Sequence, residues 1–304
     1  MASGTHQYKQ DPRNDNILIN INGELFPRSE AKISVFDSGF ILGDGVWEGM
    51  RLHNGKLAFL EQHMRRLYDG AKALDMGIGI SKEQLVERIT STCDANQMFD
   101  GVHIRLMVTR GVKSTPYQDP RVTISAATIV IIAEHKSAIA MPDNGGVSLF
   151  TSHVRRGYPD VQDPKLNTHS KLNCIFACIQ AAKAHADEAL MLDPHGFVAT
   201  CNSTHFFIAR DGEVWTSSGD FCLDGITRRN VIDICKANDI KVFERNFTLA
   251  DVYGADEAFI TGTFAGLSAV AEVDGRTIGT GDKPMLARLQ QLYIQLIETE
   301  TAGV

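Results

Sequence analysis

The sequence predicts a mixed α/β protein with two domains. Its 304 residues are more than one hydrophobic core usually organises. Alternating apolar residues predict strands in both halves, and helical spacing of apolar residues separates those strands. A turn-rich stretch over residues 138–146 changes the composition between the halves. We therefore expect an N-terminal domain over residues 1–138, a linker over residues 139–146 and a C-terminal domain over residues 147–304.

The N-terminal domain is expected to open with a β-hairpin. Apolar residues alternate over residues 17–21, and a second short strand follows over residues 24–26. Asn22-Gly23 separates the two strands, and this dipeptide favours two-residue hairpin turns because both residues tolerate positive φ.

Two helices and two further strands complete this domain. Apolar residues recur at spacings of four and three from Leu60 to Leu74, which indicates one helical face. Ser81-x-x-Gln84 is a capping box and predicts the start of a second helix. Period-two patterns then predict strands over residues 102–109 and 122–133. In the first strand the even-numbered positions are apolar, so His103 and Arg105 share the opposite face.

The C-terminal half alternates the two kinds of element. We expect strands at residues 147–153, 188–193, 205–209, 214–216, 241–244 and 258–261. We expect helices near residues 170–186, 227–237 and 284–298.

The composition disfavours several classes of protein. Acidic residues outnumber basic ones by 37 to 30, which argues against a nucleic-acid partner. The longest apolar run has about eight residues, whereas a membrane-spanning helix needs ~18 or more. The polar N-terminal stretch lacks the apolar core of a signal peptide, so we expect a cytoplasmic protein. The cysteines form no C-x-x-C pair and the histidines no metal-binding motif, which predicts reduced thiols and no metal site.

Glycine and hydroxyl residues indicate a phosphate site. A helix that begins after Gly225-Ile226-Thr227 offers free backbone N–H groups, the positive end of its dipole and a hydroxyl. A second such stretch lies at residues 261–263, and an arginine within residues 63–67 could add a positive charge. Ordinary helix caps and tight turns remain an alternative explanation, and convergence of these stretches in space would decide between the two.

Five phrases of this sequence carry a resemblance. They are G-D-G-V-W-E-G at 43–49, H-x-x-R-L at 63–67, A-D-E-A-L-M-L-D at 186–193, G-I-T-R at 225–228 and T-G-T at 261–263. In this order and spacing they resemble the class IV aminotransferases, a pyridoxal 5'-phosphate (PLP) family that includes branched-chain and D-amino-acid aminotransferases. The resemblance implies the two-domain fold-type-IV architecture with the cofactor between the domains, a homodimer or larger homo-oligomer, and an amino donor and a 2-oxo acid as substrates.

The resemblance also implies roles for individual residues. The cofactor phosphate would be held by Arg66, Ile226, Thr227, Gly262 and Thr263. Substrate contacts would come from Trp47, His103, Arg105 and Phe264, with His103 at the tyrosine position of the Tyr-x-Arg pair found in branched-chain members. This pair and Trp47 favour an apolar or branched-chain amino acid.

Two positions depart from the family pattern. The family normally reads D-P-R-V-K-S-L-N-Y-L-N around its Schiff-base lysine, and aligned without gaps this chain has Asn167 at that lysine. The glutamate that pairs with the pyridine nitrogen is replaced by Thr200, and the asparagine five residues later by His205. A neutral hydroxyl stabilises the carbanionic form of the cofactor less than a carboxylate does.

Two interpretations of these departures stay open. In the first, Lys171 serves as a relocated Schiff-base lysine, because a helix starting near Asn167 would place position i+4 on the same face. Lys165, two residues before Asn167 on a strand, is the second choice. In the other interpretation the chain binds PLP or another phosphate ligand without transamination. Lyase chemistry on the same fold is a further alternative.

Overall fold

A computed structural model of the chain describes residues 10–137 and 145–302. The described residues form two compact units. The small-sheet unit comprises the described residues up to Ser137, with Leu166–Ser170 and the residues from Glu300 onward. The large-sheet unit comprises the remaining described residues up to Lys165, and Lys171–Thr299. Most of the expected linker, residues 139–144, lies outside the described residues.

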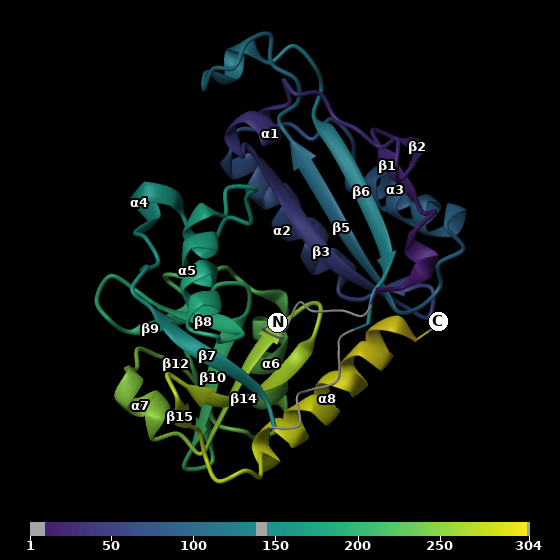
Figure 1. Cartoon of the computed structure of the whole chain (residues 1–304). Helices are drawn as coiled ribbons and strands as arrows, with labels where there is room; N and C mark the ends of the chain where they lie inside the picture. Colours follow the sequence, from purple (N-terminus) through teal and green to yellow (C-terminus); the bar gives the residue numbers. More distant parts are fainter. Residues whose placement is uncertain (1–9, 138–144, 303–304) are drawn as a thin grey trace. The chain divides into compact units, whose positions relative to one another are not determined.

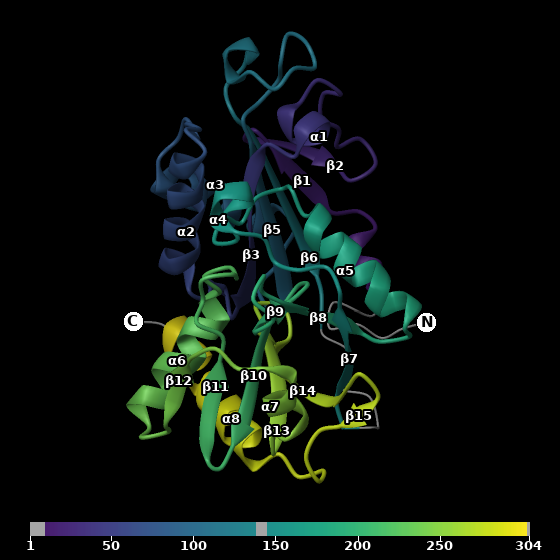
Figure 2. The same cartoon turned by 90° about the vertical axis from the view of Figure 1, so that its left-hand side faces the viewer.

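The small-sheet unit is an antiparallel sheet with helices on one face. Its described strands follow the order β2-β1-β6-β5-β3-β4. The strands are β1 (Leu18–Ile21), β2 (Glu24–Pro27), β3 (Gly45–His53), β4 (Lys56–Leu57), β5 (Val102–Thr109) and β6 (Thr128–His135). The helices are α1 (Ser38–Leu42), α2 (Leu60–Ala73) and α3 (Lys82–Ala95), with 3-10 turns at Pro12–Asn14 and Pro120–Val122. Helices α2 and α3 cover the same face of the sheet and enclose its apolar core (Figure 1, Figure 2).

Local signals in the sequence account for much of this unit. The hairpin β1–β2 forms at Asn22-Gly23, where φ is 57° and 99°. The capping box at Ser81 and Gln84 is present at the start of α3. Strand β5 covers the residues that the alternation predicts, and its even-numbered side chains belong to the core. These three predictions are confirmed.

Several parts of the small-sheet unit differ from expectation, including α1 and β4, which were not predicted. Strand β6 begins at Thr128, not at residue 122, because Asp119 caps a 3-10 turn at Pro120–Val122 and the chain reaches the sheet only afterwards. Strand β3 was not expected, although it pairs with β5 over its length. Its Glu48 occupies a core-facing position, which interrupts the apolar alternation that would have predicted a strand.

The large-sheet unit contains nine strands among the described residues. Their order is β12-β11-β10-β13-β14-β7-β8-β9, and β15 pairs with β14. The strands are β7 (Val147–Ser152), β8 (Glu188–Leu192), β9 (Val198–Cys201), β10 (His205–Arg210), β11 (Glu213–Thr216), β12 (Val242–Glu244), β13 (Glu257–Gly262), β14 (Gly266–Val273) and β15 (Arg276–Thr277). The helices are α4 (Pro159–Gln162), α5 (Leu172–Lys183), α6 (Ile226–Ala237), α7 (Leu249–Tyr253) and α8 (Pro284–Thr301).

The two faces of this sheet have different neighbours. One face carries a large apolar cluster that includes Val252 of α7. On the other face Ala189 and Met191 pack against Ala177 and Ala181 of α5, and α6 packs against β13. The expected strands and three long helices are present, whereas β9, β14, β15, α4 and α7 were not predicted because each is short or lacks a clear period.

Candidate functional site

The N-terminus of α6 in the large-sheet unit has no side-chain cap. Gly225 is the N-cap residue and no side chain caps the helix. The first intrahelical bond from this end is donated by the Arg229 N–H to the Gly225 carbonyl, 2.9 Å away. The N–H groups of Ile226 and Thr227 therefore lack intrahelical acceptors and lie at the positive end of the helix dipole. A Cβ on Gly225 would overlap the imidazole of His205, so any larger residue at this position would have to displace that ring.

The second predicted phosphate stretch lies beside this helix end. Thr261, at the end of β13, pairs directly with His205 of β10, whose ring contacts Gly225. The Thr261 hydroxyl is buried and has no hydrogen-bond partner among the described residues. The Tyr293 hydroxyl lies 3.5 Å from Thr227 Oγ1, and its ring packs near Gly266 in the β13–β14 turn.

The two stretches therefore converge within one unit. Gly262 and Thr263 follow Thr261 and are partly exposed, and Phe264 is buried in the same turn. Uncapped N–H groups beside an unpartnered hydroxyl fit an oxyanion such as phosphate better than they fit an ordinary helix cap. This geometry favours the phosphate-site interpretation of the sequence.

The Thr200 side chain forms a hydrogen bond with a backbone carbonyl in the large-sheet unit. Its hydroxyl donates to the Thr204 carbonyl at 2.8 Å, and the Thr204 hydroxyl donates to Glu188 Oε2 at 2.8 Å. Burial raises the pKa of the Glu188 carboxyl to about 7, although the bonds from Thr204 and Ser203 oppose this rise. The hydroxyl hydrogen of Thr200 is thus engaged, and towards a ring nitrogen Thr200 can only accept a hydrogen bond.

Arg66 forms a buried ion cluster in the small-sheet unit. Its Nε and Nη2 donate to the two carboxylate oxygens of Glu48 at 2.8 and 2.7 Å. His63 Nδ1 lies 2.7 Å from Glu48 Oε2. Burial opposes ionisation of Glu48, but Arg66 and His63 outweigh it and hold the pKa of Glu48 below its ordinary value. The carboxylate therefore stays charged and fixes the orientation of the Arg66 guanidinium.

Three of the predicted substrate residues lie on the opposite face of the same sheet, whereas Phe264 belongs to the large-sheet unit. The β3–β5 register pairs Gly49 with Arg105 and Arg51 with His103, so these side chains share a face with Trp47. The Arg105 guanidinium stacks on the Trp47 ring, 3.9 Å from its centroid. Burial lowers the pKa of Arg105, against the opposing charges of Glu134 and Glu48. Trp47 and Arg105 thus contact one another on one face of the sheet, and the Arg66–Glu48 pair lies on the other face.

Asn167 is fixed against β3 by hydrogen bonds in both directions. Its side-chain amide donates to the Trp47 carbonyl at 2.7 Å, and its own carbonyl accepts from the Trp47 N–H at 3.0 Å. Thr168 forms an isolated bridge with Val46, so residues 167–169 are extended and not helical. The expectation of a helix from Asn167 to Lys171 is therefore wrong, and Lys171 does not lie one helical turn after Asn167.

Helix α5 begins at Leu172, and Lys171 is its N-cap residue with a partly buried side chain. Lys165 lies exposed in a turn, where its N–H donates to Asp163 at 2.9 Å. The expectation that Lys165 lies on a strand is also wrong, because Pro164 and the Asp163 side chain hold a turn there.

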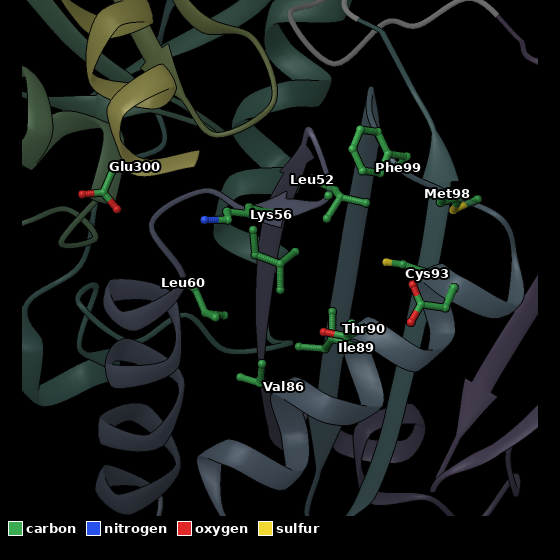
Figure 3. A pocket seen from close by; sticks show the side chains of 13 residues that line it. Leu52, Lys56, Leu60, Val86, Ile89, Thr90, Cys93, Met98, Phe99 and Glu300 are labelled. Atoms are coloured by element: carbon green, nitrogen blue, oxygen red, sulfur yellow. The ribbon is translucent and has the colours of Figure 1, made fainter. Parts of the chain in front are cut away.

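A cavity of about 430 Å³ lies elsewhere in the small-sheet unit. Figure 3 shows apolar side chains from β3, β4, α2 and α3 along it, with Lys56 directed towards Glu300. The lining residues are Leu52, Gly55, Lys56, Leu57, Leu60, Val86, Ile89, Thr90, Cys93, Asp94, Met98, Phe99 and Glu300. None of the predicted cofactor or substrate residues is among them.

Three further features of the described residues concern membrane spans, metal sites and disulfides. Within the two described ranges no helix combines the length and apolarity needed to cross a membrane. The same ranges contain no cluster of three His, Cys, Asp or Glu side chains placed to hold a metal ion. All cysteines are free; four are buried, Cys174 is partly buried and Cys178 is exposed.

Three residues of these clusters were missed by the sequence analysis. Glu48 falls in register with Val46 and Met50, and a carboxylate at an apolar position indicates a buried partner. His63 precedes Arg66 by three residues on a helix, which places both on one face. Tyr293 had no such local signal, because its contact with Thr227 joins two distant segments.

The chain is similar over most of its length to known aminotransferases. The family described as "Amino-transferase class IV" matches residues 45–273. The chain is 32% identical over 293 residues to the branched-chain-amino-acid aminotransferase of Pseudomonas aeruginosa, covering 93% of this chain and 94% of that protein. It is 32% identical over 286 residues to the D-alanine aminotransferase of Listeria monocytogenes, covering 91% and 95%. It is 40% identical to branched-chain-amino-acid aminotransferase-like protein 2 of Arabidopsis thaliana over 96% of this chain and 52% of that protein, so it spans about half the length of that relative.

Solved structures agree with the sequence comparison. A branched-chain amino acid aminotransferase complexed with N-(5'-phosphopyridoxyl)-L-glutamate matches with a TM-score of 0.85 and 31% identity, covering 94% of this chain and 95% of that chain. The branched-chain aminotransferase from Thermoproteus uzoniensis with norvaline matches with a TM-score of 0.82 and 28% identity, covering 94% and 96%. The predicted fold class, mixed α/β with the fold-type-IV architecture, is thereby confirmed. The chain belongs to the class IV aminotransferases, a family of PLP enzymes.

Proposed function

We propose that the chain is a PLP-dependent transaminase that moves an amino group between an amino acid, or an amine, and a 2-oxo acid. The main support is the convergence of the uncapped α6 N-terminus with the buried, unpartnered Thr261 hydroxyl in a chain of this family. When bound, PLP supplies an electron sink for the carbanion left when an amino acid loses its Cα proton.

The residues present fit the phosphate of this cofactor. Backbone N–H groups at Ile226 and Thr227 would bind it, with the Gly262-Thr263 turn. Arg66 is proposed as its cation from the family resemblance alone. The Glu48 carboxylate would hold the Arg66 guanidinium in one orientation, because it accepts two hydrogen bonds from this planar group.

Lys171 is proposed as the amine that bonds to the cofactor and moves the Cα proton. Its partial burial at the start of α5 distinguishes it from the exposed Lys165. The test is borohydride reduction of the protein with PLP, followed by peptide mapping. Label on Lys171 that is lost in Lys171→Ala and kept in Lys165→Ala supports the assignment; label on Lys165, or on neither lysine, overturns it.

An apolar or branched-chain amino acid is the proposed donor. The Trp47 ring offers an apolar surface, and the stacked Arg105 offers a guanidinium for a substrate carboxylate. His103 and Phe264 are proposed to complete the substrate contacts. A panel of amino donors, measured by 2-oxo acid release, tests this preference: leucine, isoleucine and valine should exceed aspartate and lysine. Equal rates across the panel would contradict it.

A second candidate is a PLP-binding protein without transaminase activity. It is favoured by the neutral residues Asn167 and Thr200, whose side chains are both engaged with backbone carbonyls. It predicts that amino acids leave the visible spectrum of the PLP-bound protein unchanged. A spectral change on adding leucine, reversed by a 2-oxo acid, excludes it.

We also propose a homodimer. The α5 residues Leu172, Ile175, Phe176 and Ile179 form a stripe at helical spacing and are 45–58% exposed. In the small-sheet unit Val35 and Phe40 are about 70% exposed, beside other apolar side chains of residues 33–42. Light scattering after gel filtration should give twice the chain mass, and Phe176→Glu should shift the population to monomer; a monomeric wild type refutes the proposal.

A further inference from the structure

Helix α8 is fixed to the strands that end at the phosphate site. Both oxygens of Glu257, on β13, accept the first N–H groups of this helix, from Met285 and Leu286, at 2.8 Å each. One turn before Tyr293, the Gln290 amide donates to the Leu267 carbonyl of β14 at 3.0 Å. These bonds define where the α8 side chains lie relative to the β13–β14 turn.

Tyr293 reaches the phosphate site from this fixed helix. Its side chain is 6% exposed, and its hydroxyl donates a long hydrogen bond, 3.5 Å, to Thr227 Oγ1. Its ring lies 3.7 Å from where a Cβ on Gly266 would stand, so the turn packs against it. Burial raises the pKa of Tyr293 to about 12, so the phenol is a neutral donor throughout the physiological range.

We propose that Tyr293 is a positioning residue of the phosphate site: it orients the Thr227 hydroxyl so that this hydroxyl donates to a bound phosphate monoester. The inference rests on the proposed PLP function. A hydroxyl has one hydrogen and can accept from another donor. A phenol is the better donor of the two and an aliphatic hydroxyl the better acceptor, so the bond runs from Tyr293 to Thr227.

This order of donors has a consequence for binding. With Thr227 Oγ1 accepting from Tyr293, its own hydrogen is directed elsewhere, and Thr227 lies in the first turn of α6 beside the uncapped N–H groups. A chain of donors that ends on an anion is mutually polarised and strengthens each bond. Without the phenol hydroxyl, the Thr227 hydrogen is free to rotate and must be ordered when the ligand binds.

The test compares Tyr293→Phe with the wild type, since phenylalanine keeps the packing against Gly266. Dissociation constants are measured by absorption titration with PLP and with pyridoxal, which lacks the phosphate. Loss of one hydrogen bond should raise the constant for PLP by roughly three- to tenfold. The constant for pyridoxal should stay unchanged, and so should the protection against thermal unfolding that pyridoxal gives. Inorganic phosphate, as the smallest probe, should protect the wild type more than Tyr293→Phe.

Two further variants separate positioning from general structure. In a Thr227→Val background, Tyr293→Phe should cause no additional loss of PLP affinity, because the acceptor is gone. Tyr253→Phe removes another phenol bond of the same unit, 2.8 Å to Asp274, and should leave the PLP constant unchanged.

Several outcomes overturn the inference. Equal loss for PLP and pyridoxal, or an undiminished effect in the Thr227→Val background, would show that Tyr293 acts through packing alone. An unchanged PLP constant in Tyr293→Phe, with a weakened one in Thr227→Val, refutes the role of Tyr293 and leaves the proposed function standing. Failure of the wild type to bind PLP refutes the proposed function and this inference with it.

Discussion

Replacing Glu48 by glutamine should destabilise the small-sheet unit strongly. The carboxylate is fully buried, and its two partners, Arg66 and His63, have side chains 16% and 1% exposed. Removing one member of a buried ion pair costs ~3–5 kcal/mol, because the remaining charge loses its compensation. Limited access of water to Arg66 lowers this cost, so we expect about 2–4 kcal/mol, a change of roughly thirty- to a thousandfold in the unfolding equilibrium.

The two tryptophans make this loss measurable in the correct unit. Trp47 lies in the small-sheet unit and Trp215 in the large-sheet unit. In a Trp215→Phe background, urea unfolding followed by fluorescence therefore reports the unit that contains Glu48. Glu61→Gln is the matched control, because it removes a carboxylate 82% exposed that pairs with Lys82 at 3.3 Å. Such a surface pair contributes only ~0–1 kcal/mol.

The pH dependence gives a second criterion for Glu48. Its pKa is lower in the folded than in the unfolded protein, so its contribution is complete above the unfolded value and declines as pH falls through the folded value. The difference in stability between wild type and Glu48→Gln should therefore shrink in acid, below about pH 4.5. A loss no larger than that of Glu61→Gln, or a difference independent of pH, would refute the reasoning.

Three further predictions concern the large-sheet unit and Asn167. Burial raises the pKa of Glu188 to about 7, so the free energy of unfolding of the wild type should fall by roughly 3 kcal/mol as pH rises from about 4.5 to about 7. In denaturant titrations, Glu188→Gln should flatten this fall. Parallel curves for the two proteins would contradict an effect of burial on this carboxyl. Gly225→Ala should lower the free energy of unfolding by ~1–3 kcal/mol and weaken PLP binding, because the new Cβ meets the His205 ring. Unchanged unfolding by calorimetry would show that the ring moves away without cost. Asn167→Ala removes the side-chain amide that donates to the Trp47 carbonyl, and should lower the free energy of unfolding by ~1–3 kcal/mol, as followed by Trp47 fluorescence. Unchanged stability would show that water replaces the amide.

The elements that could be predicted from the sequence are those defined by short-range chemistry. Asn22-Gly23 and Ser81-x-x-Gln84 determine their turn and cap from adjacent residues, and both are present. Strand β3 could not be predicted in the same way. Its core position at Glu48 is tolerable only because Arg66 and His63, on a helix formed later in the chain, compensate the charge.

In the candidate site, too, local patterns could be predicted from the sequence and long-range contacts could not. The helix start at Thr227 and the turn after Thr261 could be predicted because helix starts and glycine-rich turns are local patterns. The position of Lys171 relative to Asn167 could not, because it was argued from an assumed helix. Pairing of Thr168 with Val46, far away in the sequence, draws this segment into an extended conformation, and long-range pairing of this kind overrides local helical spacing.

The two departures from the family pattern share a physical character. The resemblance implies a charged residue at both positions in the family. Here Asn167 and Thr200 are neutral, and each side chain donates to a nearby backbone carbonyl, at 2.7 and 2.8 Å. Neither replacement therefore leaves a buried charge or an unpaired donor, so neither need lower the stability of its unit. The uncapped end of α6 and the buried Thr261 hydroxyl, which suit an anion, lie apart from both positions in the sequence. The proposed function thus assigns anchoring of the cofactor and activation of its ring to separate residues, and it predicts that substitutions at Thr227 and at Thr200 change PLP affinity and reaction rate independently.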